Sequence, residues 1–252
     1  MKTVVFQSHR EADRPEWIDL CMQSVRDWAE TRGHVYRFYG DDLLDRVPNW
    51  FVENSGGRRQ IMADLGRLLV ARELLADGAD QAIWFDADTL VFAPETMDLS
   101  LSEDPGYAFG REVWVQPAQD GRGLKAHRNI HNAVCLFRRD NVFLDFYIHA
   151  CLVIMGRVSG GVPPQIIGPK FLTAQYNILG FPVFDTVGAF SPAVLRDIHR
   201  GAGPALDLLC RKSLTRPLAA NLCASLSAEA PDMNAVCQQL LSQGPALFRQ
   251  QS

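Results

Sequence analysis

Two aspartates, Asp86 and Asp88, interrupt the otherwise apolar run QAIWFDADTLVF at residues 81–92, which predicts a buried strand. Burying an isolated carboxylate is costly, so the run needs a cation or hydrogen-bond donors opposite the pair. In a strand, residues i and i+2 face the same way, so the two carboxylates are expected to converge on one point. Their hard oxygens suit Mg²⁺ or Mn²⁺, which complete their shells with water and phosphate. The run therefore predicts a metal site that would neutralise a departing diphosphate.

The D-x-D tripeptide also has a structural explanation, in which one aspartate caps the following turn and the other pairs with an arginine. Its surroundings favour chemistry. Upstream, Asp64 and Arg67 lie three residues apart on a predicted helix and so share one face, either as a surface salt bridge or as groups that contact a phosphate or sugar. Downstream, His131 and Asn132 begin a predicted strand, where the Asn132 amide either contacts sugar hydroxyls or satisfies a turn.

The elements that would position these residues alternate along the chain. Apolar spacing and turn residues predict, in order, a strand at 3–6, a helix at 15–33, a strand at 34–40, a helix at 60–76 and the strand within 81–92. Such alternation predicts an α/β fold, with a mainly parallel sheet covered by helices on both faces. Ligands bind these sheets beyond the carboxyl ends of the strands, where Asp86 and Asp88 are expected to lie.

The second half of the chain is less regular. The predicted strands are 106–116, 131–137 and 181–185, and the predicted helices are 140–157 and 171–179. Residues 119–129 are expected to form an exposed basic loop, and residues 159–170 a Gly/Pro-rich loop. The segment 140–157 is apolar on nearly all sides, which predicts a helix buried deeply or under the sheet. From residue 201 the pattern indicates short helices that pack as a cap.

The composition limits the possible partners. A chain of 252 residues with 47% hydrophobic and 21% charged residues is typical of one large globular domain. The net charge of −4 argues against binding nucleic acid or an anionic membrane by bulk electrostatics. Dispersed cysteines without zinc-type spacing indicate a reducing setting, and the N-terminus has neither a signal-peptide nor an anchor pattern, so we expect a cytoplasmic protein. The oligomeric state is left open.

The stretch ADLGRLLVARELLADGADQAIWFDADTLVF resembles the signature of D-x-D-containing sugar transferases with the GT-A-type fold, of the family 32, family 8 and family 34 types. In that signature an Asp and an Arg on a helix, here Asp64 and Arg67, precede a Gly-containing turn and a strand that ends in D-x-D. NAVCLFRRDN is similar to the Asn-containing strand of the retaining members. The G-P-x-x-x-T pattern of Gly168, Pro169 and Thr173 is similar to the family 32 type.

This resemblance implies a GT-A-like catalytic domain over residues 1–200, with residues 201–252 as a helical extension packed on it. It implies a glycosyltransferase of hexosyltransferase type with Mn²⁺ or Mg²⁺ as cofactor, a nucleoside-diphosphate sugar as donor and an unknown acceptor such as a glycan, a lipid-linked saccharide or a protein. The implied catalytic residues are Asp86, Asp88, Asn132 and Gln165. The implied donor-binding residues are Gln7, Ser8, Asp64, Arg67 and Asp86, with Asp88 as the direct metal ligand and Asp86 shared between metal and donor.

Two residues carry weaker parts of the resemblance. Gln165 lies where several of these families have an acidic residue followed by Gln, but Pro164 precedes it here, which leaves retention or inversion of the anomeric carbon open. His199 in DIHRGAG is the candidate for the histidine that completes the metal shell in these families, and it is equally explained as an exposed residue at the end of a helix.

Three alternatives stay open at this point. FDADTLVF superficially resembles the nucleophile strand of haloacid-dehalogenase-type phosphohydrolases, but Thr89 follows Asp88 directly and at least two strands come earlier. A non-catalytic GT-A-like binding protein is the second alternative. The third is the role of individual residues that could contact an acceptor. Trp114 either stacks on an acceptor sugar or packs in a strand. The basic cluster of the loop either meets a diphosphate or an anionic acceptor, or is simply solvated; its members are Arg122, Lys125, His127 and Arg128.

Overall fold

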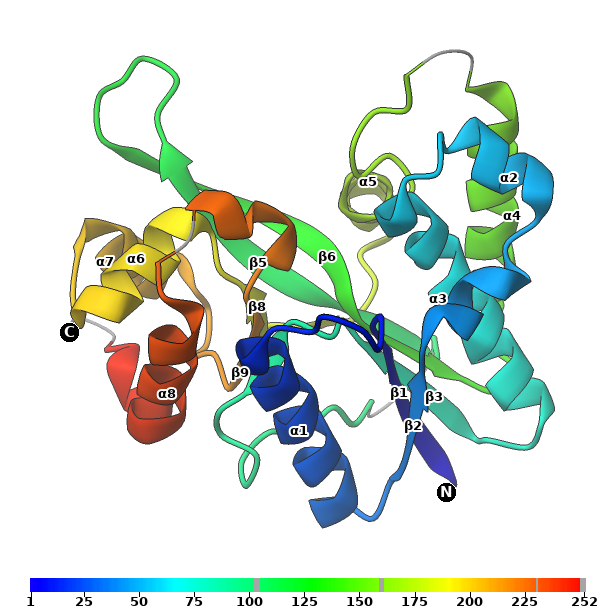
Figure 1. Cartoon of the computed structure of the whole chain (residues 1–252), viewed down its shortest axis with the longest axis horizontal. Coiled ribbons are helices and arrows are strands. Elements are labelled where there is room, and N and C mark those ends of the chain that lie inside the picture. The colour runs from blue at the N-terminus through cyan, green and yellow to red at the C-terminus, as the bar shows by residue number, and fades with distance from the viewer. Residues whose placement is uncertain (102–104, 159–160, 230, 250–252) are drawn as a thin grey trace.

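The computed structural model describes residues 1–101, 105–158, 161–229 and 231–249 (Figure 1). A six-stranded sheet runs through the molecule in the order β2-β1-β3-β6-β5-β7. Its strands are β1 (Thr3–Ser8), β2 (Val35–Tyr39), β3 (Gln81–Phe85), β5 (Tyr107–Pro117), β6 (Leu124–Arg138) and β7 (Val183–Phe184). A smaller sheet has the order β4-β9-β8, formed by β4 (Thr89–Val91), β9 (Ala219–Asn221) and β8 (Val187–Ala189).

The first half of the large sheet follows the expected alternation. β1 pairs in parallel with β2 and β3, with α1 (Glu16–Thr31) between β1 and β2 and α3 (Arg59–Ala76) before β3. β6 then pairs antiparallel with both β3 and β5, and β5 pairs in parallel with β7. The prediction of an α/β fold with a mixed central sheet and helices on both faces is therefore confirmed. Two short helices precede α3, the 3₁₀ helix η1 (Asp41–Arg46) and the α-helix α2 (Asn49–Asn54).

Alternate residues of the parallel strands build two cores. Phe6 and Trp84 face α3 and α4 (Phe143–Arg157), with their ring centroids 5.2 Å apart. Phe85 points to the opposite face, where it contacts Trp28 of α1 at 5.5 Å between ring centroids. The indole of Trp28 is fully packed and donates its N–H to the Met97 carbonyl at 3.0 Å. Packing on both faces fixes β3, and hence the turn that follows it.

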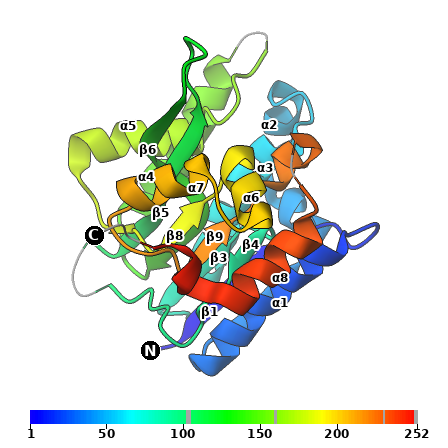
Figure 2. The same cartoon turned by 90° about the vertical axis from the view of Figure 1, so that its left-hand side faces the viewer.

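The C-terminal part packs against α1 and the far end of the β5–β6 hairpin. It contains α6 (Pro192–Arg200), α7 (Pro204–Lys212), η2 (Ala224–Glu229), α8 (Met233–Gln243) and η3 (Gly244–Leu247). Figure 2 shows α8 alongside α1, with α6 and α7 above them. The extension predicted as helical also contains a strand that was not predicted, because β9 lies at the centre of the small sheet. Its sequence, Ala-Ala-Asn, has no β-branched residue that would have indicated a strand.

Two other predictions need correction. The basic segment expected as a loop is largely strand, because β6 begins at Leu124 and pairs with β5 through Gln116 and Lys125. An antiparallel hairpin tolerates charged residues here, since one of its faces is open to solvent. α4 is buried on one side only, and Phe146 is 46% exposed on the other. α5 (Pro169–Leu179) packs against part of α4. Among the described residues, no helix is long and apolar enough to span a bilayer.

Candidate active site

A cavity of about 1290 Å³ lies at the carboxyl ends of β1 and β3. In Figure 1, α3 and α5 lie on one side of this region, and the β5–β6 hairpin and η2 on the other. The lining comes from the residues after β1, the first half of α3, the β3–β4 turn, the β5–β6 hairpin, the loop before α5 and the residues after β9. Pockets for drug-sized ligands measure about 300–1,000 Å³, so this one is large enough for a nucleotide sugar.

The two aspartates of the D-x-D motif lie in the turn between β3 and β4, not within a strand as expected. β3 ends at Phe85, and the Thr89 N–H donates to the Asp86 carbonyl at 3.0 Å to close the turn. The i, i+2 strand argument for their convergence is therefore wrong. They converge because the turn is held on both sides: Asp86 N–H donates to Ala133 O, and Leu222 N–H to Asp88 O, each at 2.8 Å.

Arg67 is the cation that compensates the partly buried charge of Asp86. Its Nη1 lies 2.8 Å from Asp86 Oδ1 and donates to the Asn132 carbonyl at 2.7 Å, and its Nη2 lies 3.1 Å from Asp64 Oδ1. The guanidinium also lies 4.9 Å above the ring of Trp84, whose indole N–H donates to Asp86 Oδ1 at 2.7 Å. Burial would lower the pKa of Arg67, but the charges of Asp86 and Asp64 outweigh it, so its pKa lies above the ordinary value.

Asp88 is held from the C-terminal part of the chain. Asn221 Nδ2 donates to Asp88 Oδ1 at 2.6 Å and reaches Asp86 Oδ2 at 3.4 Å, while the Ala224 N–H donates to Asp88 Oδ2 at 2.7 Å. Burial, followed by the charge of Asp86, raises the pKa of Asp88 to about 6 against these hydrogen bonds. Asn221 was not predicted as a site residue, because it follows two alanines in a segment with no strand or motif signal.

Asp64 and Asn132 form a buried pair beside Arg67. Asn132 Nδ2 donates to Asp64 Oδ1 at 2.7 Å, and burial raises the pKa of Asp64 to about 6 although Arg67 and Asn132 both lower it. A Cβ on Gly168 would lie 3.1 Å from both side chains, so the start of α5 packs closely against them and a larger residue there would require them to shift. The register of β5 shifts at Phe109, and this irregularity frees Asn132 from pairing with β5.

The remaining predicted site residues divide into three groups. Ser8 lines the cavity, with its hydroxyl donating to Gly40 O at 3.0 Å, and Gln165 lines it from an exposed position before α5. Gln7 is fully buried and does not line the cavity, because its amide donates to Asp86 O at 3.1 Å and accepts from the Tyr36 hydroxyl at 3.0 Å. His199 lies exposed near the end of α6, outside the cavity lining, so the structure does not bring it to the aspartates.

His131 lines the cavity but has both ring nitrogens in use. Its Nε2 lies 2.9 Å from the Val187 carbonyl, and its Nδ1 accepts the Ala133 N–H at 3.2 Å, which assigns the proton to Nε2. Burial lowers the pKa of this imidazole. A Cβ on Gly110 would lie 2.2 Å from the ring, so this position of β5 requires glycine. His131 is therefore a neutral residue that joins β6 to β8.

Glu112 is a further cavity residue that was not predicted. It lies on β5 opposite Asn129 of β6, whose Nδ2 donates to its Oε1 at 2.9 Å. Burial raises the pKa of Glu112 to about 7, and the hydrogen bond from Asn129 only partly opposes the shift. The sequence REVWVQ shows the alternation that places Glu112 and Trp114 on one face, but it does not show that this face lines a cavity.

The carboxylates fit a hard divalent cation. Asp86 Oδ1 accepts hydrogen bonds from Arg67 and Trp84. Asp86 Oδ2 has only a 3.4 Å contact with Asn221 Nδ2, the same group that donates to Asp88, and so remains available to a cation. Within the described residues, no three His, Cys, Asp or Glu side chains gather into a metal-binding group. The donor set is thus two carboxylates, which suits Mg²⁺ or Mn²⁺ with water and phosphate as further ligands, and not a structural zinc site.

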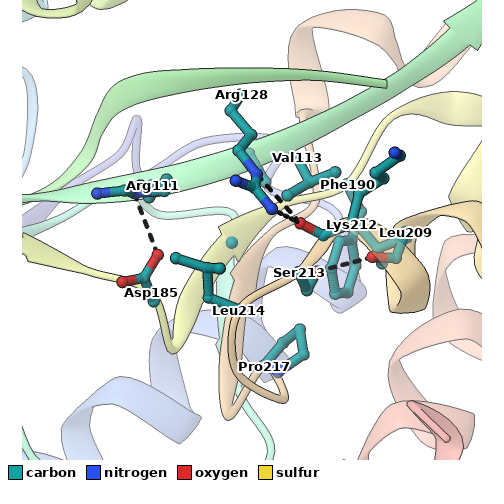
Figure 3. Close-up of a pocket in the computed structure, with 12 residues that line it drawn as sticks. Arg111, Val113, Arg128, Asp185, Phe190, Leu209, Lys212, Ser213, Leu214 and Pro217 are labelled. Carbon is teal, nitrogen blue, oxygen red and sulfur yellow. Dashed lines mark hydrogen bonds and ion pairs between the residues drawn. The ribbon is translucent and has the colours of Figure 1, made fainter. Parts of the chain in front are cut away.

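A second, much smaller cleft lies on the other face of the β5–β6 hairpin (Figure 3). Arg111 lies 3.1 Å from Asp185 there, and Arg128 donates two hydrogen bonds to the Lys212 carbonyl. Its volume of about 20 Å³ holds about one water molecule. These basic groups are therefore engaged by the protein, and the large cavity is the candidate active site.

Comparison with known proteins gives structural likenesses only. No protein-family model and no curated protein matches the chain. Among solved structures it is similar to a glycosyltransferase involved in the glycosylation of the major capsid of PBCV-1, with a TM-score of 0.48, 10% identity, and coverage of 91% of this chain and 98% of that chain. It is also similar to mouse xyloside xylosyltransferase 1, with a TM-score of 0.45, 12% identity, and coverage of 89% of this chain and 98% of that chain.

A third likeness is to Drosophila β1,4-galactosyltransferase 7 in complex with manganese, UDP-Gal and xylobiose, with a TM-score of 0.32, 11% identity, and coverage of 69% of each chain. All three proteins are described as sugar transferases. At these identities and TM-scores, the case for a function of this chain rests on the site itself.

Proposed function

We propose that this protein is a metal-dependent glycosyltransferase that moves a sugar from a nucleoside-diphosphate sugar to a hydroxyl group of a glycan, a lipid-linked saccharide or a protein. The observation that carries the proposal is that Asp86 and Asp88 lie together at a cavity of about 1290 Å³. Arg67 forms an ion pair with Asp86, and the Asn221 amide contacts both aspartates. Two oriented carboxylates at a cavity of this size suit a cation–diphosphate ligand better than a turn cap.

In this proposal Asp86 and Asp88 would hold Mn²⁺ or Mg²⁺, which when bound supplies positive charge to the departing diphosphate. Arg10, Arg58 and Arg59 line the same cavity and would add positive charge for the phosphates. The protein's part is then to hold these charges in fixed positions, so that little reorganisation is needed as the diphosphate leaves.

The donor sugar would lie beside Asp64 and Asn132. Oδ1 of Asp64 receives the contacts from Asn132 and Arg67, which leaves Oδ2 to accept a hydrogen bond from a sugar hydroxyl. Gln165, near the end of the loop that leads into α5, has a positive φ of 62° and lines the same cavity. We propose that it contacts the donor sugar from the side opposite the hairpin.

The phosphohydrolase alternative requires a free carboxylate oxygen for in-line attack on phosphorus. Asp86 would be the nucleophile, but its Oδ1 accepts from both Arg67 and Trp84, so only Oδ2, with its 3.4 Å contact from Asn221, is left for the attack. β3 is also an inner strand with an antiparallel neighbour, β6, and not the first strand of the domain. Nothing in the site favours hydrolysis over sugar transfer.

Thermal unfolding with UDP, GDP, ADP, CDP and TDP, each with and without Mn²⁺, tests the proposal. A ligand at a hundred times its dissociation constant stabilises the native state by about 2.7 kcal/mol. We expect one nucleotide to raise the melting temperature only when Mn²⁺ is present. The corresponding nucleotide sugars then identify the donor, through release of the nucleoside diphosphate. Absence of any metal-dependent shift would contradict the proposal, and stabilisation without turnover of any nucleotide sugar would favour a binding protein.

A further inference from the structure

The β5–β6 hairpin turns one face toward the cavity and the other toward the C-terminal helices. Val113 and Val115 belong to the core that contains α6, α7 and α8. Glu112 and Trp114, which alternate with these valines along β5, line the cavity instead, together with their partners on β6 in the cross-strand pairs Glu112–Asn129 and Trp114–His127. Because side chains of a strand alternate between faces, this wall is a continuous polar and aromatic surface.

Trp114 supplies the aromatic part of this wall. It is only half-buried although it lines a cavity, and its indole N–H donates to Gln116 Oε1 at 3.2 Å. The polar atom of the side chain is thus already engaged by the protein, and the ring surface is what Trp114 offers to a ligand. A partly exposed ring in a polar cavity suits the apolar C–H face of a sugar.

Glu112 supplies the acidic part of the wall. It accepts one hydrogen bond from Asn129, and no lysine or arginine within the described ranges forms an ion pair with it. A partly buried carboxyl that served only the fold would be expected to have a cation or several donors opposite it. Burial holds the pKa of Glu112 near 7, where it exchanges a proton at neutral pH.

We propose that this wall is the acceptor subsite, with a sugar ring of the acceptor on Trp114 and its attacking hydroxyl hydrogen-bonded to the Glu112 carboxylate. The inference rests on the glycosyltransferase function proposed above and deepens it. The acceptor oxygen forms a bond to the anomeric carbon of the donor sugar. The bond from that carbon to the diphosphate oxygen breaks, with its electron pair leaving on the diphosphate, and the hydroxyl proton passes to Glu112.

Glu112→Gln tests the proton transfer. The glutamine oxygen still accepts from Asn129, so the hairpin is preserved while the base is lost. With the donor found in the nucleotide screen and a panel of 4-nitrophenyl glycosides as acceptor probes, we expect kcat to fall by about 10²- to 10⁴-fold. The rise of kcat/KM with pH near 7 is expected to disappear. The titratable groups that line the cavity around Glu112 include Cys223 before η2, Asp86 and Asp88 beside that cysteine, and His127 opposite Trp114 on β6. His127→Gln serves to exclude the imidazole as the source of that rise.

Trp114→Ala and Trp114→Phe test the stacking surface. We expect alanine to raise KM for the acceptor about tenfold with a smaller effect on kcat, and phenylalanine to restore most of the affinity. The matched controls are Trp50→Ala and Glu53→Gln on α2, both exposed and outside the cavity, which are expected to leave both constants unchanged. Circular dichroism and melting temperatures establish that each variant is folded.

The two levels of the proposal fail in different ways. A wild-type protein without metal-dependent nucleotide binding contradicts the glycosyltransferase function. A wild-type protein that transfers sugar at a rate and with a pH profile that Glu112→Gln leaves unchanged contradicts the role of Glu112. Saturation-transfer NMR with the same glycosides and no donor examines the wall directly, and binding that Trp114→Ala does not weaken overturns the acceptor subsite.

Discussion

Nη1 of Arg67 lies 2.8 Å from Oδ1 of Asp86, and the same guanidinium contacts Asp64 on the same helix. Arg67 therefore joins α3 to the β3–β4 turn and provides the positive charge for the buried Asp64 carboxylate and the partly buried Asp86 carboxylate. Because Nη1 also donates to the Asn132 carbonyl, β6 is tied to the same group. A planar guanidinium makes all these contacts at once, which a lysine ammonium on a flexible stem does not reproduce.

Replacing Arg67 by methionine is expected to destabilise the fold strongly. The change leaves Asp64 and Asp86 without their cation, and removing one partner of a buried ion pair costs about 3–5 kcal/mol. Urea unfolding followed by circular dichroism measures the loss. Arg72→Met is the control on the same helix, because Arg72 is 53% exposed with only a 3.6 Å pair to Asp145, and a change within about 0.5 kcal/mol is expected there. Equal effects of the two substitutions would contradict the role of Arg67.

Asp88→Asn is expected to abolish metal-dependent nucleotide binding without unfolding the protein. Asparagine keeps an oxygen for the Asn221 amide but loses the charge that a divalent cation requires. Titration calorimetry with Mn²⁺ and the selected nucleoside diphosphate measures the effect, which we expect to exceed a factor of about 10². Asp77→Asn, at an exposed position after α3, is the matched control. Binding that survives Asp88→Asn would remove Asp88 from the metal site.

Asn221→Ala tests the residue that spans the two aspartates. Its amide orients Asp88 and reaches Asp86, so its loss is expected to weaken Mn²⁺-dependent nucleotide affinity by about 10- to 100-fold, as for other residues that orient metal ligands. The free energy of unfolding is expected to change less than in Arg67→Met, because the two aspartates lose one hydrogen-bond donor and no compensating charge. Affinity equal to the wild type would show that the turn positions Asp88 without Asn221.

Two glycines give a matched pair for packing. Gly110→Ala places a Cβ 2.2 Å from the His131 ring, so the ring or the strand must move, and we expect a loss of about 1–3 kcal/mol. Gly156→Ala, near the end of α4, meets nothing within 4 Å and is expected to stabilise the helix by about 0.5–1 kcal/mol. Thermal melting of both variants measures opposite shifts. A neutral Gly110→Ala would mean that His131 has room to move.

The pH dependence of the free energy of unfolding is expected to show the raised pKa of Asp64 in the folded protein. Burial raises its folded-state pKa to about 6, above the value of about 3.9 in an unfolded chain, so the neutral form is the better tolerated one. The contribution of Asp64 to stability is then fully present below pH 4 and is lost as pH rises through 6. Relative to Asp64→Asn, the wild-type free energy of unfolding should fall by on the order of 2 kcal/mol between pH 4.5 and 7.5. Urea titrations at several pH values measure the difference, and a constant difference would contradict the burial of the charge.

The sequence predicted the parallel half of the fold because periodicity and turn residues agree there. The helix at 60–76 and the strand before Asp86 have apolar stripes, a Gly-containing end and a packed neighbour on each side. The resemblance implied one site for Asp64, Arg67 and Asn132, and the three residues do lie together, with the first two on α3 and the third on β6.

The parts that were not predicted depend on long-range packing. Asn221 meets Asp88 across 133 positions in the chain, through a strand of three residues that carries almost no local signal. Glu112 lies on the expected strand, but its burial depends on the wall opposite it. The resemblance assigned Gln7 to the donor nucleotide, because it lies at the end of the first predicted strand, whereas the structure turns its side chain inward to support the Asp86 carbonyl.

The contact between Asn221 and the β3–β4 turn also affects the order of synthesis. The parallel strands and both aspartates leave the ribosome well before β9, which then enters the small sheet between β4 and β8. A nascent chain that stops before residue 219 has the acidic turn but lacks the amide that orients Asp88. Release-arrested chains of increasing length should therefore acquire the proposed nucleotide binding only after this strand has emerged, when most of the polypeptide has been translated.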